Sequence, residues 1–155
     1  MPPIFVKKVF KDAQLPVRAH PTDSGLDVFA YSFKMLPDGD TSEDSVRLAP
    51  GSRVMVNTGI KVTVGTGYEI QVRPRSGMAA KQGITVINSP GTVDESYRGD
   101  LCVLLINHSM DAFVINRGNK IAQLVVCPVI LSNVVEVDSL PTSDRDTGGF
   151  GSTGS

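Results

Sequence analysis

The sequence predicts one all-β domain, with the architecture of a distorted β-barrel or a jelly-roll-like sandwich. Short segments alternate apolar and polar side chains with the two-residue period of a strand. Turn-forming pairs of residues separate these segments, and the 15 Gly and 10 Pro are too evenly scattered to form a linker. The best helical pattern is only a turn or two long, over residues 77–82. Residues 1–140 are therefore expected to form one β domain.

The strands are expected, in chain order, at residues 4–10, 54–64 and 68–72, where the alternation is clearest. Residues 101–106 and 121–126 are more continuously apolar, which is typical of strands buried on both faces. Residues 134–137 supply a last short strand. The acidic segment at residues 37–45 is expected to form a surface loop between strands.

Composition argues against several classes of protein. Lys and Arg number 15 against 16 Asp and Glu, so the net charge is -1, which argues against a protein that coats nucleic acid. No apolar run approaches the roughly 20 residues needed to cross a bilayer, and no secretory signal pattern is visible. We therefore expect a cytoplasmic protein in which Cys102 and Cys127 are reduced. His20 and His108 are isolated in the sequence, which argues against zinc.

Residues 141–155 differ from the rest, because they are rich in Ser, Thr, Gly and Asp with a single aromatic, Phe150. We expect a flexible C-terminal arm there. A frayed terminus would explain the composition alone. Arg145 and the run GGFGSTG at residues 148–154 favour an arm that wraps an anion with its main-chain N–H groups.

Five polar segments punctuated by Gly interrupt the expected strands. They are residues 20–27 (HPTDSGLD), 74–78 (PRSGM), 88–100 (NSPGTVDESYRGD), 117–123 (RGNKIAQ) and the arm. Each is a weak signal alone. Together, in this order and with this spacing, they resemble the five-motif signature of the trimeric dUTPase family over nearly the whole chain. The resemblance implies the β-clip fold of that family and the hydrolysis of dUTP to dUMP and pyrophosphate.

Two segments are expected to bind phosphate. Arg75, Ser76 and Gly77 follow a strand and lead into the expected helical turn, so they offer a cation, a hydroxyl and free amides to an anion. Alone, the segment would better fit a strand-end turn with a solvated Arg, whereas the resemblance implies that Arg75 and Ser76 contact the phosphates. Gln123 is the one polar side chain in an apolar run, and it must find a hydrogen-bond partner. A bond to the backbone would satisfy Gln123, whereas the resemblance implies that it reaches the phosphate chain.

Residues 88–97 are interpreted as a hairpin with its tip at Pro90 and Gly91. The resemblance implies that this hairpin accepts uracil, with Asn88 and main-chain groups reading its polar edge. It also implies that Tyr97 lies flat against the deoxyribose, where a 2′-hydroxyl would not fit. Without the resemblance, Tyr97 would be an ordinary core aromatic. The further contacts that it implies in this region are Gly91, Thr92, Val93 and Cys102.

Asp94 is the candidate catalytic base, because a carboxylate can orient and deprotonate a water. The resemblance implies that this water attacks the α-phosphate in line. The alternative is a turn Asp that bonds its own backbone. Mg²⁺ is the implied cofactor, and no group of closely spaced carboxylates could hold it unaided, so the triphosphate and waters would carry it. Asp27 is expected to reach the metal through water or to pair with an Arg. The alternative for Asp27 is a structural turn carboxylate.

The resemblance also assigns roles in the arm. It implies that Arg145 pairs with phosphate, that Phe150 stacks on uracil, and that the γ-phosphate is covered by Gly151, Ser152 and Thr153. Asp146 departs from the family pattern, in which Gly is common, and an acid here could weaken closure. A homotrimer with shared active sites is implied, because one small barrel would struggle to bring five segments onto one substrate.

Three alternatives remain open from the sequence. One is a dCTP deaminase-like enzyme, which would share the fold and the nucleotide pocket. Another is a nucleotide-dependent regulatory protein of the same fold that binds a protein partner. The third is a purely structural jelly-roll protein, which would leave the five ordered motifs unexplained. The stretch at residues 94–97 and the Gly-rich arm with Phe150 favour a dUTPase.

Overall fold

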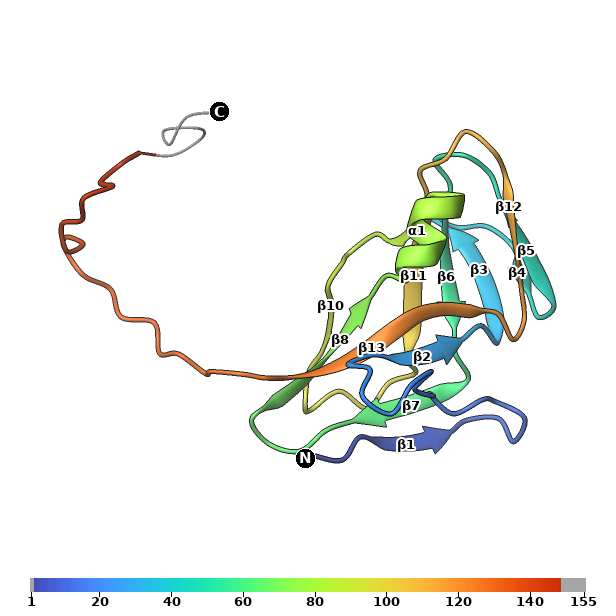
Figure 1. Cartoon of the computed structure of the whole chain (residues 1–155), viewed down its shortest axis with the longest axis horizontal. Helices are drawn as coiled ribbons and strands as arrows, with labels where there is room; N and C mark the ends of the chain where they lie inside the picture. The colour runs from blue at the N-terminus through green and yellow to red at the C-terminus, as the bar shows by residue number, and fades with distance from the viewer. Residues whose placement is uncertain (1, 149–155) are drawn as a thin grey trace.

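The structure is a computed structural model that describes residues 2–148, and nearly all of its regular structure is β (Figure 1). Its elements, in chain order, are β1 (Phe5–Lys8), β2 (Leu26–Phe29), β3 (Ser32–Leu36), β4 (Thr41–Ser42), β5 (Ser45–Leu48), β6 (Arg53–Asn57), β7 (Ile60–Thr63), β8 (Tyr68–Arg73), α1 (Ser76–Gln82), β9 (Ile84–Val86), β10 (Gly91–Val93), β11 (Cys102–Asn107), β12 (Phe113–Asn116) and β13 (Lys120–Pro128).

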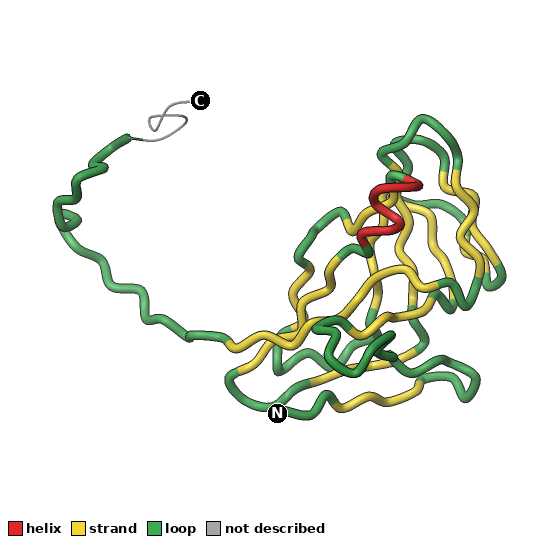
Figure 2. Tube along the Cα trace, viewed as in Figure 1, coloured by secondary structure: helices red, strands yellow, loops and turns green. Residues whose placement is uncertain are grey.

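The strands form two larger sheets and two strand pairs. One larger sheet has the order β10-β8-β13-β2, the other has the order β4-β3-β6-β11-β9, and β1-β7 and β12-β5 are the pairs. Neighbouring strands are antiparallel throughout these sheets. Figure 2 shows strands through most of the body, with α1 lying beside them. The predicted all-β architecture is confirmed.

The core lies between the two larger sheets and is filled by alternate residues of their strands. Val54 and Val56 of β6, Ile70 of β8 and Leu124 of β13 have no exposed surface. The strands expected to be buried on both faces are not. In β11, every second side chain from Cys102 onward is only half-buried, because a single chain covers only one face of the sheet.

Two glycines fix sharp connections in the body. The helix expected at residues 77–82 is found as α1, and it ends at Gly83, whose φ of 66° is left-handed and whose N–H donates to Ala79 O. Gly59 turns the chain between β6 and β7 with a φ of 71°. A Cβ at Gly59 would lie 2.9 Å from the Cβ of Ala13. Both positions therefore require glycine.

A polar cluster ties the N-terminal segment to the turn before β13. Arg117 pairs with Asp12 at 2.5 Å and covers the ring of Tyr31 at 3.9 Å, and the Tyr31 hydroxyl donates to Asp12 at 2.9 Å. The ring of Phe10 stacks on that of Tyr31, with 4.6 Å between the two ring centroids. These contacts hold the start of the motif at residues 117–123 in place.

The sequence misses several elements and misplaces one. The strands β2, β3, β5, β9 and β12 have three to five residues each, which is too short to give a clear alternation. The expected loop at residues 37–45 contains β4 and the first residue of β5. The strand expected at residues 134–137 is wrong. That segment has no hydrogen-bonded neighbour, and a strand needs one to persist.

Residues 129–148 contain no helix or strand and lead away from the body (Figure 1). Within residues 2–148, no helix is long and apolar enough to cross a membrane.

Candidate active site

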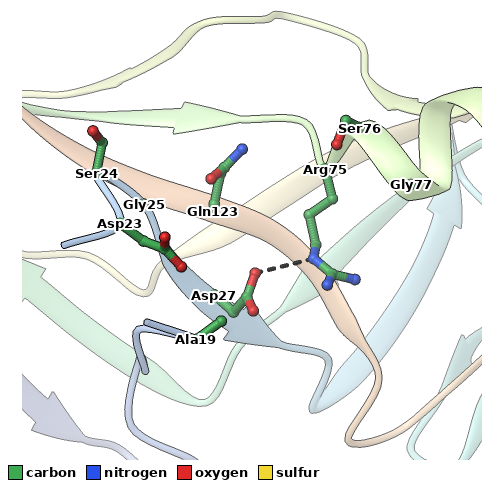
Figure 3. Close-up of a pocket in the computed structure, with 9 residues that line it drawn as sticks. All are labelled: Ala19, Asp23, Ser24, Gly25, Asp27, Arg75, Ser76, Gly77 and Gln123. Atoms are coloured by element: carbon green, nitrogen blue, oxygen red, sulfur yellow. Dashed lines mark hydrogen bonds and ion pairs between the residues drawn. The ribbon is translucent and has the colours of Figure 1, made fainter. Parts of the chain in front are cut away.

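The first candidate half-site is a polar pocket of about 350 Å³. Its wall comes from the segment before β2, from β2 itself, from the start of α1 and from β13 (Figure 3). It is lined by Ala19, Asp23, Ser24, Gly25, Asp27, Arg75, Ser76, Gly77 and Gln123. Arg75, Ser76, Gly77 and Gln123, which were predicted to bind phosphate, are in this set, and so is Asp27 of the first motif.

Strand pairing brings these residues together. β13 lies between β2 and β8, and Gln123 is opposite Asp27 on one side and Arg73 on the other. Arg75 follows two residues after Arg73, so its side chain reaches Asp27 across β13. Residues about 50 and 100 positions apart in the chain thus share one wall because of sheet register.

Asp27 is the electrostatic centre of the polar pocket. One carboxylate oxygen accepts from Arg75 Nε at 3.0 Å, and the other pairs with Lys120 Nζ at 2.8 Å. The Asp27 side chain is only 14% exposed, so both ion pairs are partly shielded from water. The expected pairing of Asp27 with an Arg is therefore present. The Arg75 guanidinium also donates to Lys120 O at 3.3 Å, which fixes its orientation.

Charges of both signs surround the polar pocket, and Arg18 adds a cation at its edge by donating to Asp23 O. Arg75 and Lys120 supply two cations, and Asp23 and Asp27 supply two carboxylates. The Asp23 carboxylate accepts the main-chain N–H of His20 at 2.9 Å. A polyanion entering this pocket would meet little net positive charge, so a counter-cation would favour its binding.

Gln123 satisfies its amide nitrogen on the backbone, donating to Pro74 O at 3.0 Å. Its amide oxygen faces Gly25, where a Cβ would lie 2.0 Å away. Because Gly25 has no side chain, Gln123 can occupy the pocket wall. The backbone bond is the structural alternative raised for Gln123, and a contact with phosphate stays a prediction.

The second candidate half-site is a smaller pocket of about 270 Å³ near β10 and the start of β11, which we call the turn pocket. It is lined by Thr92, Val93, Asp94, Tyr97, Asp100, Leu101 and Cys102. Asp94 and Tyr97 are brought together by a β-turn, in which Tyr97 N–H donates to Asp94 O at 3.1 Å. The Tyr97 hydroxyl donates to Asp100 O at 3.0 Å, so the ring is held folded over its own loop.

Burial, together with the nearby Asp100 carboxylate, raises the pKa of Cys102 above its usual value. This thiol therefore remains protonated at neutral pH, and it forms a weakly polar part of the wall of the turn pocket.

The hairpin expected at residues 88–97 is wrong, because the strands on either side of Pro90 do not pair with each other. β9 pairs with β11 and β10 pairs with β8, so the chain crosses from one larger sheet to the other at residues 87–90. Gly91 lies opposite Val72, where a Cβ would be 3.3 Å from the Val72 side chain. Asn88 is exposed and does not line the turn pocket. Strand partners are set by tertiary packing, which turn residues alone do not reveal.

One chain does not bring the two half-sites together. Val93 pairs with Ile70, and Arg75 lies five residues further along from Ile70. At the rise of a β-strand, this separation is about 17 Å. Arg75 and Asp94 therefore lie at opposite ends of β8 within one chain.

The arm is described only as far as residue 148. Arg145 is exposed and its Nε donates to Gly148 O at 2.8 Å. Asp146 has a φ of 42°, a left-handed value that an L side chain rarely adopts. Asp146 stands where Gly is common in the family, and Gly would adopt this φ without strain. The predictions for Phe150, Gly151, Ser152 and Thr153 lie outside the described residues.

The sequence also missed residues of the two half-sites. Lys120 was quoted within a motif but given no role, and Gly25 and Asp100 were not singled out. For Lys120 a signal existed, because it precedes an apolar strand by one position and a cation there must find a partner. For Gly25 no local signal existed, because Gln123 comes from a distant strand. The Asp100 carboxylate was missed because its partners, Asn57 and Lys61, come from β6 and β7.

The fold and the two pockets define a small all-β protein with a polar pocket suited to an anion and a separate pocket beside a turn carboxylate. The sequence model of the dUTPase family matches residues 11–154, and the chain belongs to that family. A curated deoxyuridine 5′-triphosphate nucleotidohydrolase of Hydrogenobaculum sp. (strain Y04AAS1) is 46% identical over 97% of this chain and 97% of its own.

Solved structures agree in fold. A single-residue mutant of the dUTPase of Staphylococcus bacteriophage 80alpha, solved with dUpNHpp, superposes with a TM-score of 0.83 at 24% identity, over 99% of both chains. A mutant dUTPase from phage phi11 of S. aureus, described with a structural Mg(II) ion, gives a TM-score of 0.75 at 22% identity, over 90% of this chain and 99% of that one.

Proposed function

We propose that this protein hydrolyses dUTP to dUMP and pyrophosphate. The observation that carries the proposal is the β-turn that places Asp94 and Tyr97 in one pocket, in a chain of the dUTPase family. A carboxylate and an aromatic ring side by side suit a site where a base acts next to a nucleoside.

Asp94 acts as the general base. Its carboxylate accepts a proton from a water, the water oxygen bonds to the α-phosphorus, and the bond from that phosphorus to the bridging oxygen breaks in line. The electron pair leaves on pyrophosphate. Among the described residues no hydrogen bond reaches the Asp94 carboxylate, so it is available to a water.

The polar pocket binds the phosphate chain. Arg75 and Lys120 supply charge, and the Ser76 hydroxyl and the amides at the start of α1 supply donors. Within residues 2–148 no group of three His, Cys, Asp or Glu side chains could hold a metal. Both oxygens of Asp27 already pair with cations, so a direct metal bond would require one pair to break.

These features fit Mg²⁺ that arrives with the triphosphate and meets Asp27 through water. When bound, Mg²⁺ supplies charge neutralisation on the phosphate oxygens. The two carboxylates of the polar pocket support this assignment, because Asp23 and Asp27 offset most of the positive charge of Arg18, Arg75 and Lys120.

The nucleoside occupies the turn pocket. Its volume of about 270 Å³ leaves little room beyond a base and a deoxyribose. We place the sugar against Tyr97 and the base near Thr92, Val93 and Cys102. Asn88 and Gly91 lie at the other end of β10, and they would reach the base only if the connection at residues 87–90 moves inward.

The active site is completed by a homotrimer. The separation of Arg75 and Asp94 along β8 supports this assembly, because one triphosphate would have to reach both residues. The segment after β13 points the same way, because its apolar side chains are almost fully exposed in one chain and would be covered in an assembly: Ile130, Leu131, Val134 and Leu140. A mass of three times 16.5 kDa in solution is expected, and a monomeric mass under active conditions would contradict it.

The arm closes over the bound substrate. Arg145 is free to leave Gly148 and pair with phosphate, and Phe150, Gly151, Ser152 and Thr153 would cover the remaining groups. An arm that orders only over substrate excludes water from the reaction, at an entropic cost.

The test is release of pyrophosphate from dUTP, dCTP, dTTP and UTP with Mg²⁺, with ammonia measured in parallel. We expect pyrophosphate from dUTP, strong discrimination against the other three, and no ammonia from dCTP. Asp94→Asn should lower turnover on the order of 10²- to 10⁴-fold, as expected for a lost general base. Asp38→Asn, an exposed loop carboxylate, is the matched control. Ammonia from dCTP, or no pyrophosphate from dUTP, would refute the proposed function, whereas a fully active Asp94→Asn variant would refute the role of Asp94 as general base.

A further inference from the structure

Arg98 folds back onto the turn that carries Asp94. Its Nη1 donates to Glu95 O at 2.6 Å and to Tyr97 O at 2.8 Å, and it lies 3.1 Å from the Thr63 hydroxyl oxygen. The two carbonyls belong to the residue after Asp94 and to the last residue of the turn. One guanidinium thus holds two oxygens of the β-turn at once.

A second set of donors comes from β7 and the residues after it. The Thr63 hydroxyl donates to Glu95 O at 3.0 Å, and the Thr66 hydroxyl donates to the Glu95 carboxylate at 2.8 Å. Glu95 is therefore held through both its main chain and its side chain. Both of these bonds tie the turn to β7 and the segment after it through Glu95, directly beside Asp94.

Tyr97 and Asp94 depend on these contacts to different degrees. The Tyr97 hydroxyl has its own bond to Asp100 O, and the Asp100 carboxylate is held by Asn57 at 3.3 Å and by Lys61 at 3.5 Å. The Asp94 carboxylate has no such partner among residues 2–148. Its position is set by the backbone of the turn, and hence by what holds that backbone.

We propose that Arg98 is a positioning residue, which with Thr63 fixes the Asp94 carboxylate for attack on the α-phosphate; this rests on the proposed hydrolysis of dUTP. Charge-assisted bonds to carbonyl oxygens are stronger than neutral ones, so removing the guanidinium loosens the peptide beside Asp94. A displacement of about 1 Å at a reacting group can cost on the order of 10²-fold in rate. Binding suffers less, because Tyr97 keeps its bond to Asp100.

The test compares Arg98→Met, Arg98→Lys and Arg47→Met. Arg47 is an exposed arginine on β5, and it serves as the matched control because no hydrogen bond of its side chain is found within residues 2–148. For Arg98→Met we expect kcat to fall about 10- to 100-fold, with the Kd of an imido analogue of dUTP changed less than about threefold. Arg98→Lys keeps a cationic donor without the planar fork, so its kcat should lie between those of Arg98→Met and the wild type.

Combination with Asp94→Asn separates positioning from a general structural role. If Arg98 acts through Asp94, adding Arg98→Met to Asp94→Asn should leave the residual kcat unchanged within about twofold. Thr63→Val, which removes one donor to the same carbonyl from a different strand, should lower kcat by a few-fold on its own. It keeps the proposal testable if Arg98→Met does not fold.

Several results would overturn the proposal. They are an Arg98→Met kcat within twofold of the wild type, a Lys variant no better than the Met variant, a loss of analogue binding in proportion to kcat, or an equal further loss in the Asp94→Asn background. A wild-type protein that does not hydrolyse dUTP would instead refute the proposed function. The two failures are therefore distinct.

Discussion

Arg75 and Asp94 lie at opposite ends of β8 in one chain, and this geometry makes a prediction about mixed assemblies. Asp94→Asn removes the proposed base and should lower turnover on the order of 10²- to 10⁴-fold. Arg75→Gln removes a charge-assisted contact worth about 1.5–3 kcal/mol, which corresponds to about 10- to 100-fold. Each variant alone should retain at most about a tenth of the wild-type turnover.

Mixing the two variants should restore activity. The strand register places Val93 opposite Ile70, so about 17 Å separates the two residues in one chain. A site that takes Arg75 from one copy and Asp94 from another can therefore combine two native residues. With equal amounts and random assembly of a closed ring, both are native in about one quarter of the sites.

The assay is pyrophosphate release after the two purified variants are unfolded together and refolded, or after they are co-expressed. We expect about 25% of the wild-type rate, because about a quarter of randomly assembled sites are intact. A mixture of Asp94→Asn with the Arg75→Gln/Asp94→Asn double variant is the control and should stay inactive, since it contains no native Asp94. If the first mixture also stays inactive while its mass is that of a trimer, the shared site is refuted.

Three further predictions concern Gly25, Cys102 and the arm. Gly25→Ala should push Gln123 off Pro74 and lower Tm by about 3 °C, for a lost bond of about 1 kcal/mol, whereas Gly65→Ala, whose Cβ would meet no atom within 4 Å, should not. Because burial raises the pKa of Cys102 above its usual 9.0, iodoacetamide labelling at pH 8 should be slower in the folded protein than in urea. Equal labelling rates would contradict the burial of this thiol. A chain that ends at residue 140 should keep the Tm of the whole protein but lose most of its turnover of dUTP, and full turnover would exclude the arm from the reaction.

Much of the fold class could be predicted from the sequence. The alternation at residues 68–72 was clear because it reflects local geometry, the two-residue period of a strand. The helical turn of α1 was predicted for the same reason. The five motifs were visible because they interrupt apolar strands with polar residues and glycine.

The candidate site could be predicted only in part. Five residues of the polar pocket were identified from the sequence: Asp27, Arg75, Ser76, Gly77 and Gln123. The pairing of Asp27 with both Arg75 and Lys120 was not, because it depends on β13 lying between β2 and β8. The bond from Thr63 to the turn that carries Asp94 was not predicted, because Thr63 lies in a strand 32 positions before Glu95.

The sequence by itself determined an all-β chain, its turns and the chemical groups available to a nucleotide, because these depend on neighbours within a few residues. Only the tertiary structure decided which strands pair, so only it showed that residues 84–93 cross between sheets instead of forming a hairpin. It alone placed Arg75 and Asp94 at opposite ends of β8. Strand partners are chosen by packing over the whole core, and no short stretch of sequence contains that information.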